Sequence, residues 1–163
     1  MKGITLTLRA LHHGERALEK DLLAAAARHR TEHEVHHVAL DLARWSREHT
    51  ARLAALAPHY DAELSGPSAR PLSGVADALR AKAAEALGHR PEPGLLLLHD
   101  LRALHLAAAG NSLHWEMLAQ AARAGRDDRL LDTASACHPE TLRQVRWTNT
   151  MVKVLSPQIL TSL

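Results

Sequence analysis

The chain has 163 residues, of which 46% are hydrophobic, and a formal net charge of +2. One domain with a sizeable core is expected at this length, and the absence of any run of like charges argues against a nucleic-acid-binding arm. The longest uninterrupted apolar run, Leu95 to Leu98, is far too short to span a membrane. The apolar residues are mainly Leu, Ala and Val, with no Phe, which favours helix throughout the chain.

The cysteine and histidine content bears on location. The single cysteine, Cys137, has no internal disulfide partner, which fits a reducing compartment. The short apolar start of the chain runs into His12 and His13, so it makes a poor signal peptide, and we expect a cytoplasmic protein. The thirteen histidines occur in a composition also rich in Ala, Arg and Leu, which is typical of biased codon usage, and most of them are expected on the surface.

The first predicted helix covers about residues 4–29. Its core-facing stripe is apolar at every early position except Glu15. A carboxylate within an apolar stripe is costly unless another group pairs with it. The stripe advances by steps of three and four, as in a helix packed lengthwise in a bundle: Ile4, Leu8, Leu11, Glu15, Leu18, Leu22, Ala25 and His29.

The second predicted helix covers about residues 32–57 and ends before Pro58. Thr31 and Glu34 have the spacing of a capping box, which would start this helix directly after the first. So tight a connection makes the two helices antiparallel neighbours.

One polar residue, His49, also interrupts the stripe of the second helix. In a hairpin that turns near Thr31, residues whose numbers add up to roughly sixty-two lie side by side. His49 is therefore expected beside His12, His13 and Glu15. The stripe reads Val35, Val38, Leu42, Trp45, His49, Arg52 or Leu53, and Leu56.

The second half of the chain repeats this plan after a long connection. Turn-forming residues surround one short amphipathic helix, predicted over about residues 75–87, and the connection is long enough to cross the bundle. The third long helix is predicted over about 95–124, with His105 beside its stripe of Leu97, Leu101, Leu104, Ala108, Asn111, Trp115, Leu118 and Ala122.

The fourth long helix is predicted over about residues 127–155. Its first residues are acidic, which suits a helix N-terminus, and Pro139 should kink it or divide it in two. Its expected stripe is polar for a core: Leu130, Ala134, Cys137, Thr141, Val145, Thr148, Val152 and Leu155.

Two long hairpins joined by a long crossover make an all-α four-helix bundle of the ferritin-like arrangement, with a short extra helix in the crossover. The chain resembles bacterial ferritin-like proteins of the rubrerythrin-related kind over nearly its whole length. The segments that carry this resemblance are residues 11–15 (LHHGE), residues 45–49 (WSREH) with Leu53, and residues 121–127 (AARAGRD).

The resemblance implies a di-iron site, and the sequence retains only part of the ligand set. Such sites take one Glu from each of two helices and a Glu-x-x-His pair from each of the other two. Glu15, His49 and Glu140 match ligand positions, whereas Ser46, Ala108 and Arg143 stand where ligands would be expected. Because metal sites depend sharply on ligand number, a complete di-iron site is not expected.

Three interpretations stay open for Glu15, His49, His12 and His105. They form a buried, hydrogen-bonded polar cluster that is the remnant of a metal site. Alternatively, Glu15 and His49 hold a single iron, manganese or zinc ion with one further histidine. In the third interpretation, the helix phases differ and leave Glu15 partly exposed.

Other candidate sites have simpler structural explanations. Glu34 and His37 form the one intact Glu-x-x-His pair, but Glu34 is also the expected capping-box residue. His33 and His37, with His29 and His36 nearby, have the spacing of an adventitious surface metal site. Cys137 at a core position is expected to be a small core residue, and Trp45, Trp115 and Trp147 are expected to fill the core.

These observations favour a non-catalytic ferritin-like bundle that has lost its di-iron centre and serves as a structural or interaction module, as a homodimer without a cofactor. Neither nucleic acid nor membrane is expected as a partner. The alternative is a metal-binding or redox protein that uses Glu15, His49 and neighbouring histidines.

Overall fold

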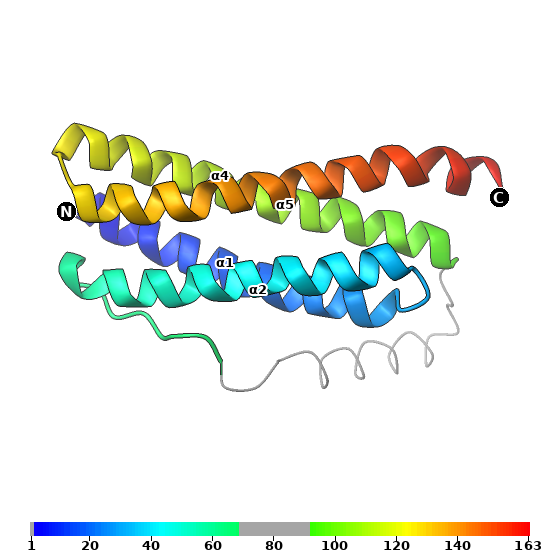
Figure 1. Cartoon of the computed structure of the whole chain (residues 1–163), viewed down its shortest axis with the longest axis horizontal. Helices are drawn as coiled ribbons and strands as arrows, with labels where there is room; N and C mark the ends of the chain where they lie inside the picture. The colour runs from blue at the N-terminus through cyan, green and yellow to red at the C-terminus, as the bar shows by residue number, and fades with distance from the viewer. Residues whose placement is uncertain (1, 69–91) are drawn as a thin grey trace.

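The computed structural model describes residues 2–68 and 92–163 as an all-helical bundle (Figure 1). These residues contain no strand, and the all-α four-helix prediction is confirmed. The four long helices are α1 (Lys2–Arg28), α2 (His33–Leu56), α4 (Pro93–Gly125) and α5 (Asp128–Thr161), and a short 3₁₀ helix, η1 (Ala57–Tyr60), follows α2.

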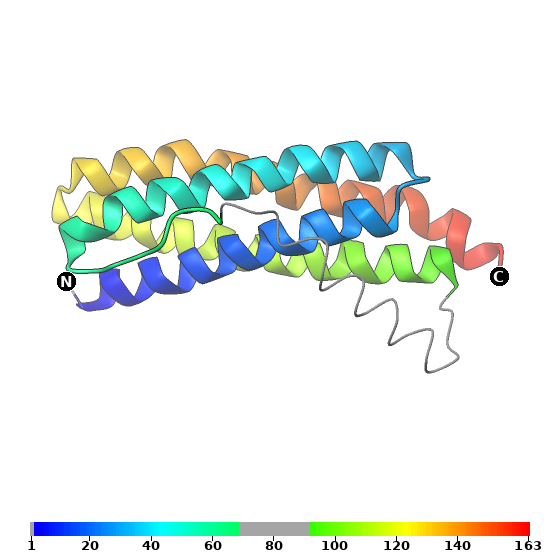
Figure 2. The same ribbon diagram turned by 90° about the horizontal axis from the view of Figure 1, so that it is seen from below.

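The helices form two antiparallel hairpins, α1–α2 and α4–α5, that pack side by side along their length (Figures 1 and 2). Helix α2 ends at the end of the bundle where α1 begins, whereas α4 begins at the opposite end. Helices α2 and α4 therefore point in the same direction. The short helix predicted over residues 75–87 lies outside the described residues.

The turn between α1 and α2 does not use the predicted capping box. The N-cap residue of α2 is Glu32, and its side chain makes no capping hydrogen bond. Backbone contacts close the turn instead, since the Glu32 amide donates to the His29 carbonyl at 3.0 Å. The α4–α5 turn does have a side-chain cap, in which the carboxylate of Asp127 accepts a hydrogen bond from the Leu130 amide at 3.1 Å.

Helix α5 is one continuous helix, so Pro139 does not divide it, which was one of the two effects predicted for this proline. The predicted end near residue 155 is wrong, because the helix runs past Pro157 to Thr161. Pro139 is exposed, so its missing N–H leaves a carbonyl that solvent can reach. The last turn is held by tertiary packing, because Ile159 lies against Gly94 of α4 so closely that a methyl group on Gly94 would meet it at 2.8 Å.

The core-facing stripes match the prediction closely in the first three long helices. Every predicted stripe position of α4 is buried. In α2, Val38 and Trp45 are half-buried, and Ala39 and Ser46 lie in the core beside the other predicted residues. In α5, Gln144 and Met151 are buried where Val145 and Val152 were expected, because the buried face advances by three residues after Thr141.

Within residues 2–68 and 92–163, three apolar clusters extend along the bundle, and Trp115 is the largest fully buried side chain. A group of buried polar residues lies at mid-length, and these include Glu15, His49 and Gln144. No helix in the described ranges is both long and apolar enough to cross a membrane.

Candidate functional site in the bundle core

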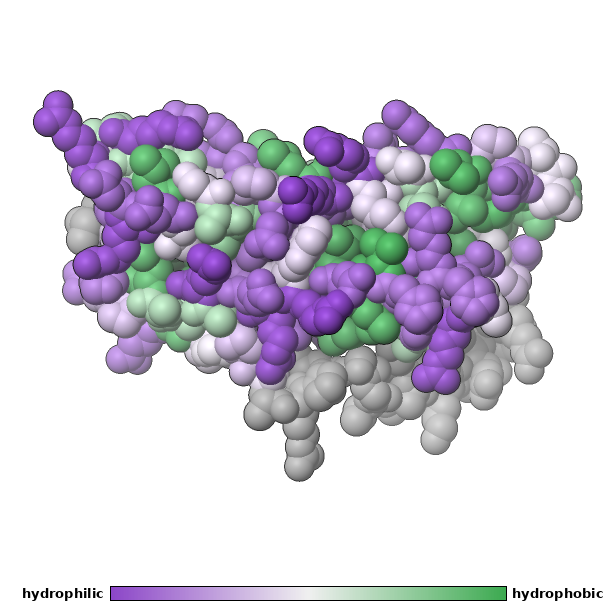
Figure 3. Space-filling view, viewed as in Figure 1, coloured by the Kyte–Doolittle hydropathy of each residue, from purple (hydrophilic) through white to green (hydrophobic). Residues whose placement is uncertain are grey.

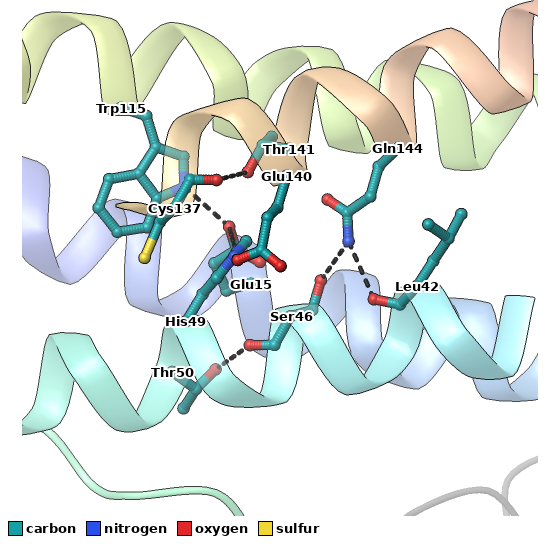
Figure 4. Close-up of polar contacts among 10 residues, drawn as sticks. All are labelled: Glu15, Leu42, Ser46, His49, Thr50, Trp115, Cys137, Glu140, Thr141 and Gln144. Carbon is teal, nitrogen blue, oxygen red and sulfur yellow. Dashed lines mark hydrogen bonds and ion pairs between the residues drawn. The ribbon is translucent and has the colours of Figure 1, made fainter. Parts of the chain in front are cut away.

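Glu15 is fully buried at the centre of the bundle, and one of its oxygens receives contacts from two other helices (Figure 4). The indole N–H of Trp115 on α4 donates to Glu15 Oε1 at 3.0 Å. His49 Nδ1 on α2 lies 3.1 Å from the same oxygen. One oxygen of the buried carboxylate therefore has two partners, and because Glu15 is fully buried, the interpretation in which it is partly exposed is wrong.

His49 lies between two carboxylates from different helices. Its Nε2 atom is 3.3 Å from Glu140 Oε1 on α5, while Nδ1 faces Glu15. Burial alone would lower the pKa of His49, but the hydrogen bonds and negative charges of Glu15 and Glu140 raise it above 6.5. We call Glu15, His49, Trp115 and Glu140 the central cluster.

The central cluster is closed on one side and open on the other. Glu15 and His49 are fully buried, whereas the side chain of Glu140 is 27% exposed. Solvent therefore reaches the cluster from the α5 side. The second oxygen of Glu15, Oε2, is buried and has no hydrogen-bond partner, and the same holds for the side-chain nitrogen of Asn111.

A second polar group adjoins the central cluster and holds α2 to α5. The amide nitrogen of Gln144 donates to the Leu42 carbonyl and to Ser46 Oγ, both at 3.0 Å (Figure 4). Thr50 donates to the Ser46 carbonyl at 3.0 Å. These bonds satisfy buried polar atoms within the protein and occupy the hydroxyl of Ser46.

The structure separates the other two predicted site residues from Glu15 and His49. His12 is buried, but its Nε2 atom contacts the Ser65 carbonyl at 2.7 Å. His105 Nδ1 contacts Thr148 Oγ1 at 3.0 Å. These partners lie outside the central cluster, so the predicted set of four is brought together only in part.

The histidines near the α1–α2 turn do not converge on one site, because they contact different groups. His29 Nε2 lies 2.7 Å from Asp100 Oδ2, and His36 Nδ1 lies 2.7 Å from the Ala26 carbonyl. His33 and His37 are exposed, with their ring centroids 6.5 Å apart. Glu34 is exposed as well.

Cys137 is a buried core residue, as predicted for a cysteine in the core-facing stripe. Burial raises the pKa of its thiol to about 12, and the nearby carboxylates of Glu15 and Glu140 act in the same direction. The thiol is therefore protonated at neutral pH and is a poor nucleophile there.

Two members of the central cluster were absent from the predicted site. Trp115 was expected only to fill the core, and nothing in the sequence shows that its N–H points at Glu15. Glu140 was considered as a remnant of a di-iron ligand set, and that match was the available signal. Among residues 2–68 and 92–163, no group of three or more His, Cys, Asp or Glu side chains has a geometry that could hold a metal ion.

Comparison with known proteins identifies no relative of this chain. No protein-family model, no curated protein and no solved structure matches this chain.

Proposed function

We propose that this chain is a ferritin-like four-helix bundle whose di-iron centre has been replaced by a hydrogen-bonded polar cluster, and that it serves as a non-catalytic structural or interaction module. The proposal rests on the helix directions, on the residues at the expected ligand positions and on the contacts of the central cluster.

The helix directions support the ferritin-like part of the proposal. Helices α2 and α4 run in the same direction although each belongs to an antiparallel hairpin. A bundle with one long connection between its two hairpins has this arrangement, whereas a bundle with only short loops alternates its directions.

The residues at the expected ligand positions support the loss of the metal centre. Ser46 lies where the second helix would supply a Glu, and its hydroxyl accepts a hydrogen bond from Gln144. Ala108 is fully buried among apolar residues, and Arg143 is exposed. Three of the six positions therefore carry no ligand, and the residues present do not fit a di-iron group.

The observation that carries the proposal is that the atoms of Glu15 and His49 that could bind a metal make hydrogen-bond contacts with other side chains instead. Glu15 Oε1 serves both Trp115 and His49, and each nitrogen of His49 faces a carboxylate. An imidazole with protons on both nitrogens has no lone pair for a metal, so the raised pKa of His49 works against coordination.

Metal analysis of the full chain, purified without a tag or chelator, tests the proposal. We expect a folded protein with far less than one metal ion per chain. The variant E15Q should remain folded, because a Gln oxygen still accepts the bonds from Trp115 and His49. Circular dichroism and elemental mass spectrometry on the same samples give both results.

The opposite outcome would support the alternative function. Near-stoichiometric iron, manganese or zinc that disappears in E15A and H49A would make the chain a metal-binding or redox protein. H33A serves as the matched control, since His33 is exposed near the α1–α2 turn. Metal lost in H33A but kept in E15A would reveal adventitious binding by the surface histidines, and the proposal would then stand.

A further inference from the structure

Helix α4 carries large apolar side chains on its outward face as well as on its inward face. Four large apolar side chains on the outward face are exposed, namely Leu95 (43%), Leu106 (54%), Leu113 (62%) and Met117 (55%). Steps of eleven, seven and four residues place them on one line along a helix. We call these four residues the outward stripe.

No charged residue interrupts the middle of this face. Arg102 and Glu116 are consecutive charged residues in the sequence, and the thirteen residues between them contain no Asp, Glu, Lys or Arg. The exposed face of α2, in contrast, carries Glu34, Asp41, Arg44 and Glu48. The side of the molecule on which α2 and α5 face the viewer is accordingly mostly hydrophilic, with separate apolar patches (Figure 3).

A large apolar side chain on a helix is normally directed toward a packed interior. The inward side of α4 packs against α1 and α5, but within the described residues the outward stripe remains exposed. His99 and Arg102 are exposed between Leu95 and Leu106, whereas the stretch from Leu106 to Leu113 carries no charged residue. An exposed apolar patch of this kind marks a surface that another molecule covers. The distance from Leu95 to Met117 along the helix is about 33 Å, long enough for a helix-to-helix interface.

The order of residues on this face is self-complementary. In an antiparallel pair of α4 helices related by a two-fold axis near Ala109 and Gly110, residues whose numbers add up to about 219 face each other. Leu106 then lies against Leu113 of the partner subunit. A two-fold interface needs this reciprocity, because the same surface must serve both copies.

The charged residues that flank the apolar segment support the same arrangement. Arg102 would lie near Glu116 of the partner subunit, and the reverse contact follows from symmetry. A parallel pairing would instead bring like charges together. Glu116 is half-exposed, and its contacts with Gln120 at 2.6 Å and with His138 at 3.6 Å leave it at the surface.

The centre of the face permits close approach. Gly110 is exposed, and a methyl group added there would meet no atom within 4 Å. Because Gly110 has no side chain and Ala109 has only a methyl group, we expect a shallow gap between Leu106 and Leu113. Leucine side chains of an opposing helix fill such gaps when two helices pack together.

We infer that the outward face of α4 is a homodimer interface, in which two copies pack their α4 helices antiparallel about a two-fold axis near Gly110. This inference goes beyond the proposed function and beyond the homodimer expected from the sequence, since it specifies the interface and the direction in which the two copies pair. It does not depend on the state of the central cluster.

Sedimentation equilibrium of the full chain tests the dimer directly. We expect the wild-type protein to dimerise and L113E to raise the dissociation constant by about 30-fold or more, as for a residue at an interface centre. V154E is the matched control, because Val154 is 53% exposed on α5 and should leave association unchanged. A monomeric wild-type protein, or equal weakening by both variants, would overturn the inference.

Charge exchange tests the direction of pairing. R102E and E116R should each weaken the dimer, because each sets like charges opposite one another, and the double variant should restore association. A double variant as weak as the single ones would contradict the antiparallel arrangement.

Cysteine crosslinking tests the position of the two-fold axis, and the only native cysteine is buried and protonated. Oxidation should join two copies of G110C efficiently. It should not join A103C, since residue 103 would lie about 20 Å along the helix from its counterpart, far beyond the reach of a disulfide. Crosslinking of A103C but not G110C would overturn the proposed geometry. Metal content plays no part in these measurements, so their failure is separate from failure of the proposed function.

Discussion

The stability of buried Glu15 depends on a few individual atoms. Its Oε1 atom contacts both the indole N–H of Trp115 and the Nδ1 atom of His49, whereas its Oε2 atom has no hydrogen-bond partner. A buried carboxylate with few donors is sensitive to the loss of any one of them, because the remaining bonds must offset the whole desolvation cost.

Removal of the indole donor tests this dependence. The variant W115F keeps an aromatic ring but removes the N–H, and we expect the free energy of unfolding to fall by about 1–3 kcal/mol. Trp147 provides the control, because its indole nitrogen is buried and already lacks a partner. W147F should therefore change stability little. Urea denaturation followed by circular dichroism measures both, and equal losses would contradict the role assigned to the Trp115 bond.

The charge on His49 should make stability depend on pH. Because its pKa is raised in the folded state, its contribution is fully present below about pH 6.5 and is lost as the pH rises through the folded pKa. We expect H49Q to remove this part of the pH dependence in urea denaturation as the pH rises above about 6.5. H59Q should retain it, since His59 is exposed. An unchanged profile in H49Q would show that other groups cause the dependence.

Part of this site could be predicted from residues alone. The contact between Glu15 and His49 could be predicted, because each is the polar residue that interrupts the apolar stripe of its helix and the two lie at the same level of the predicted hairpin. The bond from Trp115 could not be predicted, since it depends on the orientation of the indole ring. The separation of His12 from Glu15 could not be predicted either. His12 contacts the backbone carbonyl of Ser65, and every residue type has such a carbonyl, so the sequence does not identify this partner.

Among the elements, regular helices were predictable and their ends were not. The stripe of α4 matched at every position because its apolar spacing is regular. The stripe of α5 departed from the prediction at Gln144, since a glutamine in the core carries no apolar signal. The local sequence around Pro157 favours an end of the helix there. The helix nevertheless continues to Thr161, because Ile159 packs against Gly94 of α4.

Pro139 destabilises helix α5 locally, and packing in the rest of the bundle compensates for this loss of stability. It lies within α5 immediately before Glu140, and it lacks the N–H that would bond to the carbonyl of Ser135. We expect P139A to raise the free energy of unfolding by about 1–3 kcal/mol. P157A should have a smaller effect, because it lies in the last two turns of the helix. A destabilised P139A would mean that the proline holds Glu140 in position, and urea denaturation distinguishes the two results.

At the scale of the whole molecule, the last turns of α5 help to close one end of the bundle. Ile159 packs against an apolar cluster that includes Val35 of α2 and Leu97 of α4, so three helices contribute to this end. Deletion of residues 156–163 should lower Tm by roughly 3–8 °C, since it exposes this cluster. Deletion of residues 162–163 alone should leave Tm unchanged, because both are exposed. Calorimetry measures both, and an unchanged Tm in the longer deletion would show that these turns do not stabilise the bundle.

The nearness of Trp115 to His49 has an optical consequence. Their ring centroids lie 5.8 Å apart, with the planes at 80°. A protonated imidazole quenches the emission of a neighbouring indole, whereas the neutral ring does so much less. With Trp45 and Trp147 replaced by Phe, the remaining fluorescence would report the protonation of the bundle centre, and Trp115 would act as an intrinsic optical probe of His49 that needs no added dye.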